Sequence, residues 1–206
     1  MTPHDAPSPD VRHAWRLRAG RTVVDFLWSG DRWAHRIHVG GDFPAADTAG
    51  PRRGEAGGDT IGQAVCDSTW DATGDVVWDS LEGPGPPATD PRWPTAPVLV
   101  ELSRIATAAA AERSPLVGVG LAGRSHFSAS IAPDPRTDDA VRFEIACRLH
   151  EPPVWLGSTY RVGGRTVRLS APIDAAPLPR TVVWSYSIGP RGIGGISGAT
   201  RTDEPA

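Results

Sequence analysis

The sequence predicts an all-β domain, an antiparallel β-sandwich or open barrel of about nine or ten strands with long Gly/Pro-rich loops. Between residues 117 and 149, apolar residues alternate with polar or small ones in three successive runs, and this is the period of a strand. The 23 glycines and 21 prolines cluster between the patterned segments, where turns belong. We expect at most one short helix, near residues 104–113. A chain of 206 residues fits one domain and needs neither a metal nor a disulfide to fold.

The N-terminal part predicts a tail followed by a hairpin. Residues 1–12 are polar and rich in proline, so we expect a disordered tail. The β-branched and aromatic runs 22–28 and 32–39 flank a turn at Ser29-Gly30-Asp31, which predicts a β-hairpin. Alternate residues of its second strand share one face: Trp33, His35, Ile37 and Val39.

Two long loops then interrupt the domain. Residues 40–64 and 82–97 are rich in Gly and Pro, and they surround a short apolar segment at 76–81. For residues 98–113 we favour a strand to about Arg104 followed by a short helix or loop. One continuous helix stays open as an alternative, because alanines and a near-helical apolar spacing follow the strand-like start.

The clearest pattern is the meander of residues 117–149. We expect Phe127 opposite Ile145, Ala129 opposite Phe143 and Ile131 opposite Val141, with all six on the buried face. A slip by one residue would bury the charged set instead.

The C-terminal part predicts two more strand regions and a tail. Residues 154–162 and 165–169 flank Gly163-Gly164, so we expect a tight hairpin with Tyr160 facing Val167. A last strand, 181–188, places four apolar residues on one face: Val182, Trp184, Tyr186 and Ile188. Residues 189–206 are Gly-rich and then acidic, which predicts a flexible tail. The single β domain is therefore expected over residues 13–188.

Composition excludes several functional classes. The 21 basic residues, all arginine, and the 24 acidic residues give a net charge of −3 without a basic stripe, so no nucleic-acid partner is expected. No apolar run is long enough for a membrane span, and residues 1–12 lack the apolar centre of a signal peptide. Two isolated cysteines, Cys66 and Cys147, favour the cytoplasm. His35 and His38 fall on opposite faces of a strand, so we expect no metal and no cofactor.

One set of residues suggests catalysis. In the expected register, Glu144 and Arg148 flank His126 diagonally, and Ser128 shares their face. Serine, histidine and glutamate are the groups of a small hydrolase or lyase. No G-x-S-x-G elbow accompanies them, so the alternative interpretation is a polar sheet face.

Two further sets suggest binding. Five basic side chains are candidates for contacting a protein partner or an anionic ligand: Arg124, His126, Arg142, Arg148 and Arg161. The chain also has eight tryptophans, and exposed ones can stack on sugars. The candidates for such a carbohydrate-binding platform are Trp15, Trp70, Trp93 and Trp155.

Four segments resemble a group of uncharacterised bacterial proteins. They are Trp93-Pro94, the stretch Leu121 to Ser128 with its sequence LAGRSHFS, Ala146-Cys147-Arg148, and the stretch Leu156 to Arg161 with its sequence LGSTYR. The resemblance covers residues ~90–161 and implies a recurring β-rich domain. It implies no activity and transfers no catalytic residue.

We therefore expect a non-enzymatic β-sandwich-like module that binds another protein through the polar face of the 117–149 meander. The two alternatives are the hydrolase or lyase and the carbohydrate-binding module. The sequence predicts no membrane partner and does not specify an oligomeric state.

Overall fold

A computed structural model describes residues 15–40, 76–81, 96–107, 109–174 and 176–205. The predicted tail at 1–12 and nearly all of the predicted loops 40–64 and 82–97 lie outside the described residues.

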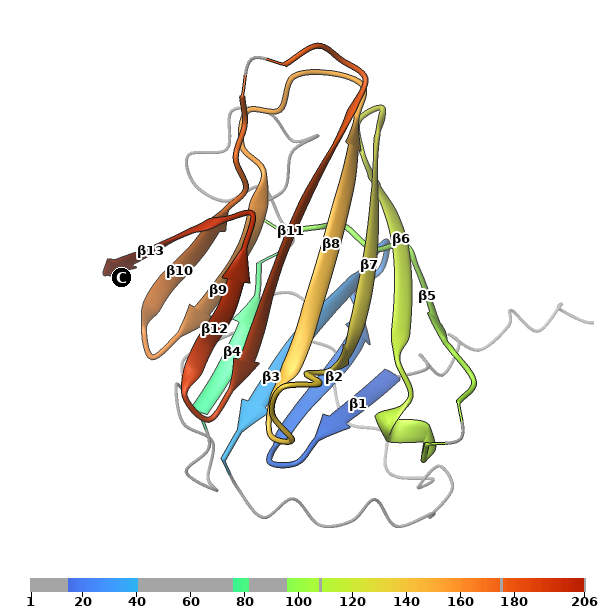
Figure 1. The fold of residues 1–206 in the computed structure, drawn as a ribbon, viewed down its shortest axis with the longest axis vertical. Helices are drawn as coiled ribbons and strands as arrows, with labels where there is room; N and C mark the ends of the chain where they lie inside the picture. The colour runs from blue at the N-terminus through green and yellow to red at the C-terminus, as the bar shows by residue number, and fades with distance from the viewer. Residues whose placement is uncertain (1–14, 41–75, 82–95, 108, 175, 206) are drawn as a thin grey trace, which may run out of the picture.

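Thirteen strands occur in the described part of the chain, and they form two antiparallel sheets (Figure 1). Sheet A has the order β1-β2-β3-β4-β9-β10-β13, and sheet B has the order β12-β11-β8-β7-β6-β5. The strands of sheet A are β1 (Trp15–Ala19), β2 (Thr22–Trp28), β3 (Trp33–Val39), β4 (Val76–Ser80), β9 (Gly157–Val162), β10 (Arg165–Ser170) and β13 (Thr200–Pro205). The strands of sheet B are β5 (Glu101–Arg104), β6 (Leu116–Ala122), β7 (Ser125–Pro133), β8 (Val141–Leu149), β11 (Arg180–Gly189) and β12 (Gly192–Ser197).

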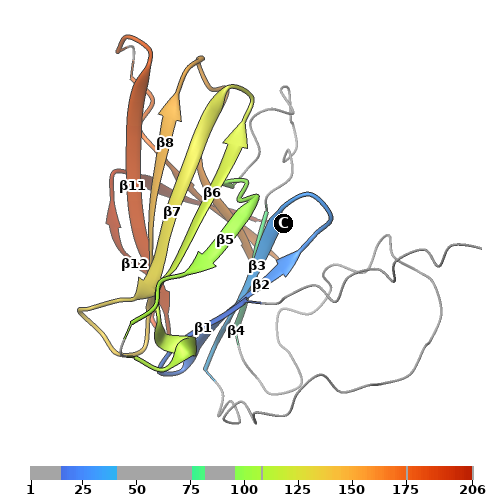
Figure 2. The same cartoon turned by 90° about the vertical axis from the view of Figure 1, so that its right-hand side faces the viewer.

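The two sheets form separate layers (Figure 2) and do not close into a barrel. The all-β prediction is confirmed in its sandwich form, with thirteen strands instead of nine or ten. No helix among the described residues has the length and apolar character needed to cross a membrane.

The core lies between the sheets and contains two polar links that join them. Trp184, Tyr160 and Tyr186 are the largest fully buried side chains. Trp184 Nε1 donates to Ser158 Oγ at 2.9 Å, and the hydroxyls of Tyr160 and Tyr186 lie 2.6 Å apart. Because each link joins a strand of sheet A to one of sheet B, buried polar atoms are satisfied where the layers meet. His35 Nε2 extends this chain to Tyr160 at 3.0 Å.

The meander register differs from our prediction by two residues. Phe127 lies opposite Cys147, Ala129 opposite Ile145, and Ile131 opposite Phe143. The predicted buried face is confirmed, because a shift of two residues keeps every side chain on its face. The alternation therefore could not separate the two registers. In the observed register the pairing of β7 with β8 extends to Pro133 and Val141, and it ends where Asp134 N–H donates to Ala140 O at 2.8 Å.

In the second half of β6 the small residues point inward and the large ones outward. Gly118 and Gly120 are buried, whereas Val119 and Leu121 are about half exposed. A Cβ on Gly120 would lie 1.5 Å from Val98 O, so the glycine lets the chain before β5 cross closely over β6. This close approach keeps the glycines inward and leaves Val119 and Leu121 on the outer face.

The structure also agrees with the predictions for residues 98–113, for the Gly163-Gly164 hairpin and for the strand that contains residues 182–188. The preferred interpretation of 98–113 is confirmed: β5 ends at Arg104, and a short 3₁₀ turn, η1 (Ala111–Arg113), is the one helical element among the described residues that follow it in this range. The Gly163-Gly164 hairpin is confirmed with both glycines at positive φ and with Tyr160 opposite Val167. The strand face of 182–188 is confirmed as well, since all four predicted residues are buried.

The flexible tail predicted at 189–206 is wrong over its described residues. Gly192–Ser197 pairs with β11, and Thr200–Pro205 pairs with β10 along six residues. Glycine and charged residues are depleted in strands, which is why the pattern indicated a tail. Pairing at the sheet edges tolerates both, because an edge strand with an exposed face needs few apolar side chains.

Candidate functional site

The outer face of sheet B carries an open groove of about 510 Å³ over β6, β7 and β8, which we call the β6–β8 groove. It is lined by residues of five strands and of the segment before β5: Val100, Glu101, Val119, Gly120, Leu121, His126, Phe127, Ser128, Ala146, Arg148 and Thr181. Inward and outward residues alternate along β6, β7 and β8, so the exposed residues of the three strands lie together on this outer face.

Apolar side chains form the middle of this face. Val119 and Leu121 are 47% and 49% exposed. Val119 lies opposite Ser128, Ser128 opposite Ala146, and Ala146 opposite Val183, which is 58% exposed. A row of small and apolar groups therefore crosses four neighbouring strands. The side-chain period alone did not reveal this row, because the sequence gives no sign of which face of β6 is covered.

Charged groups flank the apolar row on two sides. Arg148 lies directly opposite His126, and its Nη1 donates to Thr181 Oγ1 at 3.4 Å. The ring of His126 packs edge-on against His150 at 5.8 Å. On the other side, exposed Glu101 lies opposite Val119. The groove thus has a basic rim on β8 and an acidic rim on β5.

The catalytic set is not assembled. Glu144 lies opposite Ser130, four positions along β8 from Arg148, which is the residue opposite His126. Four residues along a strand correspond to about 13 Å. The Glu144 carboxylate is paired with Arg142 at 3.0 Å. Ser128 and His126 are neighbours on the face, and in the described part of the chain no hydrogen bond joins them. The two-residue change in register explains this separation, because the expected diagonal contact of His126 with Glu144 depended on the other register.

The five predicted binding residues lie in three places. His126 and Arg148 face the groove, and Arg124 lies in the β6–β7 turn at its end, where its backbone N–H donates to Glu151 Oε1 at 3.3 Å. Arg142 lies further along β8, where it is bound by Glu144 and by Ser185 Oγ at 3.1 Å. Arg161 belongs to β9 of sheet A, opposite Asp79, so it does not share a face with the others.

The tryptophan platform is not assembled among the described residues. Trp15 on β1 is half-buried with the Arg104 guanidinium 5.5 Å from its ring. Trp155 precedes β9 and donates from Nε1 to Ser170 Oγ at 3.1 Å. Three strands of sheet A separate β1 from β9. Trp70 and Trp93 lie outside the described residues.

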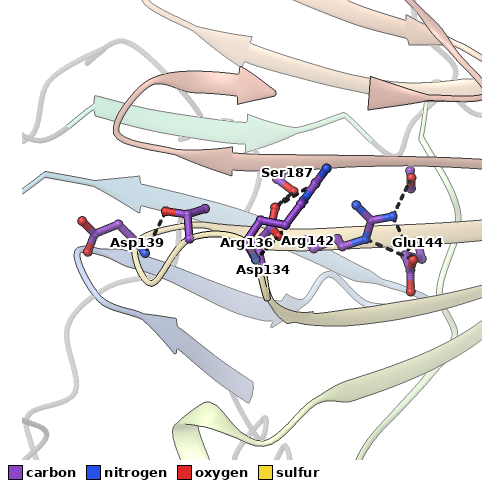
Figure 3. A network of polar contacts seen from close by, with 8 residues as sticks. Asp134, Arg136, Asp139, Arg142, Glu144 and Ser187 are labelled. Atoms are coloured by element: carbon purple, nitrogen blue, oxygen red, sulfur yellow. Dashed lines mark hydrogen bonds and ion pairs between the residues drawn. The ribbon is translucent and has the colours of Figure 1, made fainter. Parts of the chain in front are cut away.

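A second polar site, which the sequence analysis missed, lies at the opposite end of β7 (Figure 3). Asp134 follows β7 and is 5% exposed. Arg136 donates from Nε and Nη2 to its two carboxylate oxygens, each at 3.1 Å, and Ser187 Oγ also donates to it. Burial by itself raises the pKa of Asp134, but these hydrogen bonds outweigh it and lower the pKa to about 2. No local sequence signal points from Asp134 to Ser187, 53 positions away.

The described residues contain no group of three or more His, Cys, Asp or Glu side chains placed to hold a metal ion. His35 packs between the sheets against Phe143, whereas His38 Nε2 lies 3.9 Å from Asp25 Oδ2 on the outer face, so these two rings point apart as expected. Burial raises the pKa of Cys147 to about 12, which keeps this thiol protonated and unreactive.

Fold and site together define a two-sheet antiparallel β-sandwich with an open, partly apolar groove on one outer face. No protein-family model, no curated protein and no solved structure matches this chain.

Proposed function

We propose that this protein is a non-enzymatic binding module that docks a protein partner in the β6–β8 groove. The observation that carries the proposal is the exposure of Val119 and Leu121, side by side on one strand, beside a groove of about 510 Å³. Exposed apolar groups that adjoin a groove and have a polar rim are characteristic of interaction sites.

The rims specify the chemistry of the partner. Arg148 on β8 complements a carboxylate, and Glu101 on β5 complements a basic group. The two residues lie on strands three spacings apart, or about 14 Å across the sheet. A complementary partner has apolar side chains between an acidic and a basic residue. Charge pairs at such a rim mainly set orientation and association rate, while the apolar centre supplies affinity.

The separation of His126 from Glu144 and the engagement of Glu144 by Arg142 favour this function over hydrolysis. The cytoplasm remains the proposed location, on the basis of cysteine usage.

The first test replaces Leu121 with Asp and uses Leu27→Asp as the matched control, since Leu27 is equally exposed at 49% but lies on β2 of sheet A. Partners are captured from lysate with the natural chain and both variants. Each candidate is then purified and titrated directly. We expect Leu121→Asp to weaken binding at least about tenfold, because it places a charge in a desolvated apolar contact, and Leu27→Asp to leave it unchanged.

A second variant tests the orientation of the partner. Arg148→Glu should slow association and reduce its dependence on salt, and a carboxylate-to-arginine change on the partner should restore the rate. Equal loss of binding in the two leucine variants would contradict the proposed groove. Turnover of a substrate that disappears in His126→Ala would instead establish the hydrolase alternative.

A further inference from the structure

A second depression, of about 340 Å³, lies at the end of sheet B opposite the groove. Its walls come from the β7–β8 connection, which supplies Arg136, and from the β11–β12 turn, which supplies Arg191. Glycines 192, 194 and 195 line it as well. Asp134 is eight positions from His126 along the chain, which corresponds to about 27 Å of extended strand, so this depression is distinct from the β6–β8 groove.

The Arg136 guanidinium is held in one orientation. Nε and Nη2 bind the Asp134 carboxylate, and the backbone N–H of Arg136 donates to the same carboxylate at 2.9 Å. Arginine has five guanidinium N–H groups, so three remain available for another acceptor. The Arg136 side chain is 57% exposed although that of Asp134 is only 3% exposed. A buried carboxylate thus fixes an accessible cation, which reduces the entropy lost when that cation binds a ligand.

The glycines make room for this arrangement. Gly195 has φ +57°, and a Cβ there would lie 2.3 Å from Arg136 Nη2, so only glycine lets the guanidinium lie against β12. Gly192 and Gly194 have no heavy atom within 4 Å of an added Cβ, so the surface beside Arg136 is open.

The charged residues that line the depression are Asp134, Arg136 and Arg191, so its lining is positive. Asp134 and Arg136 compensate each other, whereas exposed Arg191 forms no ion pair with any residue in the described ranges. Asp139, the other acid that forms an ion pair in this connection, faces Arg21 instead, at 3.8 Å.

We propose that this depression binds the phosphate or carboxylate group of a small anionic ligand, with Arg136 as the preoriented donor and Arg191 as the second cation. Guanidinium groups match the paired oxygens of both anions. This site is independent of the protein-docking function proposed above.

The test is a titration of the whole protein with inorganic phosphate, pyrophosphate and succinate, followed by the amide NMR signals of Gly192, Gly194 and Gly195. We expect saturable shifts in the millimolar range. Arg191→Ala should weaken binding roughly tenfold, and Arg148→Ala, which removes an arginine from the other end of the sheet, should have no effect. The preferred probe distinguishes a phosphate from a carboxylate ligand.

A shape variant separates a built site from general attraction by charge. Gly194→Val fills the open floor and leaves every charge in place, so it should abolish the saturable shifts while far-UV circular dichroism stays unchanged. The proposal is overturned if none of the three anions gives a saturable response, or if Arg191→Ala and Gly194→Val respond as the natural chain does. Leu121→Asp should not alter this titration, so the two sites can fail separately.

Discussion

At the scale of single residues, Asp134 joins the end of β7 to a distant strand, β11. It terminates β7, fixes Arg136 and accepts a hydrogen bond from Ser187 on β11. A buried carboxylate is stable only when its partners compensate for the lost hydration.

Because the pKa of Asp134 is lowered in the folded state, the free energy of unfolding should decrease at acidic pH. Because the pKa in the folded state is about 2 and the ordinary value is 3.8, the stabilisation is complete above about pH 5 and is lost as the pH falls toward 2. At 1.36 kcal/mol for each pKa unit it amounts to about 2 kcal/mol. We expect Asp134→Asn to lower the free energy of unfolding by about this amount at pH 7. Urea unfolding of both proteins between pH 7 and pH 2.5 measures the difference, which should shrink with acidification. A difference that is constant with pH would disprove the assignment.

The sequence pattern predicted residues of the β6–β8 groove, but it did not predict the contacts of Asp134 with Arg136 and Ser187. His126 and Arg148 were candidates because alternation places both on the outer face, and the structure brings them opposite each other. Asp134 and Ser187 are joined only by the pairing of β8 with β11, which a single sequence does not specify. Contacts set by the period of one element are predictable, whereas contacts set by long-range pairing are not.

At the scale of elements, the segment that crosses β6 at Val98 determines which face of β6 points inward. Gly120 meets the backbone of Val98, and a backbone cannot move aside as a flexible side chain can. The alternation of Val and Gly in β6 indicated a strand correctly. It could not indicate that the glycines face the core, because in most strands the larger apolar residues do.

We expect Gly120→Ala to destabilise the protein by about 3 kcal/mol or more, through overpacking against Val98. Gly194→Ala is the matched control, since its Cβ would meet no heavy atom within 4 Å. The control should change stability by less than about 1 kcal/mol. Chemical denaturation of both variants measures this, and equal midpoints would show that the crossing at Val98 yields easily.

The meander register shows how far an element pattern can be used. Pairing Ile131 with Val141 and pairing it with Phe143 bury the same residues, so the hydrophobic period cannot choose between them. The choice depends on the connection at 134–140, which Asp134 closes. The catalytic hypothesis failed to assemble for the same reason, as it required one register in particular.

At the scale of the whole molecule, the chain enters both layers more than once. It passes from sheet A to sheet B before β5, returns for β9 and β10, and crosses twice more through β11 and β12 to β13. The hydrogen bonds Trp184–Ser158 and Tyr160–Tyr186 join β11 of sheet B to β9 of sheet A. The sandwich class was predictable from turns and alternation, but this order of strands was not.

This topology implies an order in which the strands pair during folding. Strands β5 to β8 are neighbours both in the chain and in sheet B, whereas Ser80 of β4 must find Tyr160 of β9 across that whole meander. Closing long loops is slow, so we expect the meander to form first. In stopped-flow experiments Ile131→Ala, in β7, should mainly slow folding, and Val77→Ala, in β4, should mainly speed unfolding. The reverse pattern would place the nucleus in sheet A. A nucleus in the meander means that the surface proposed for partner binding is in place before the core behind it is complete.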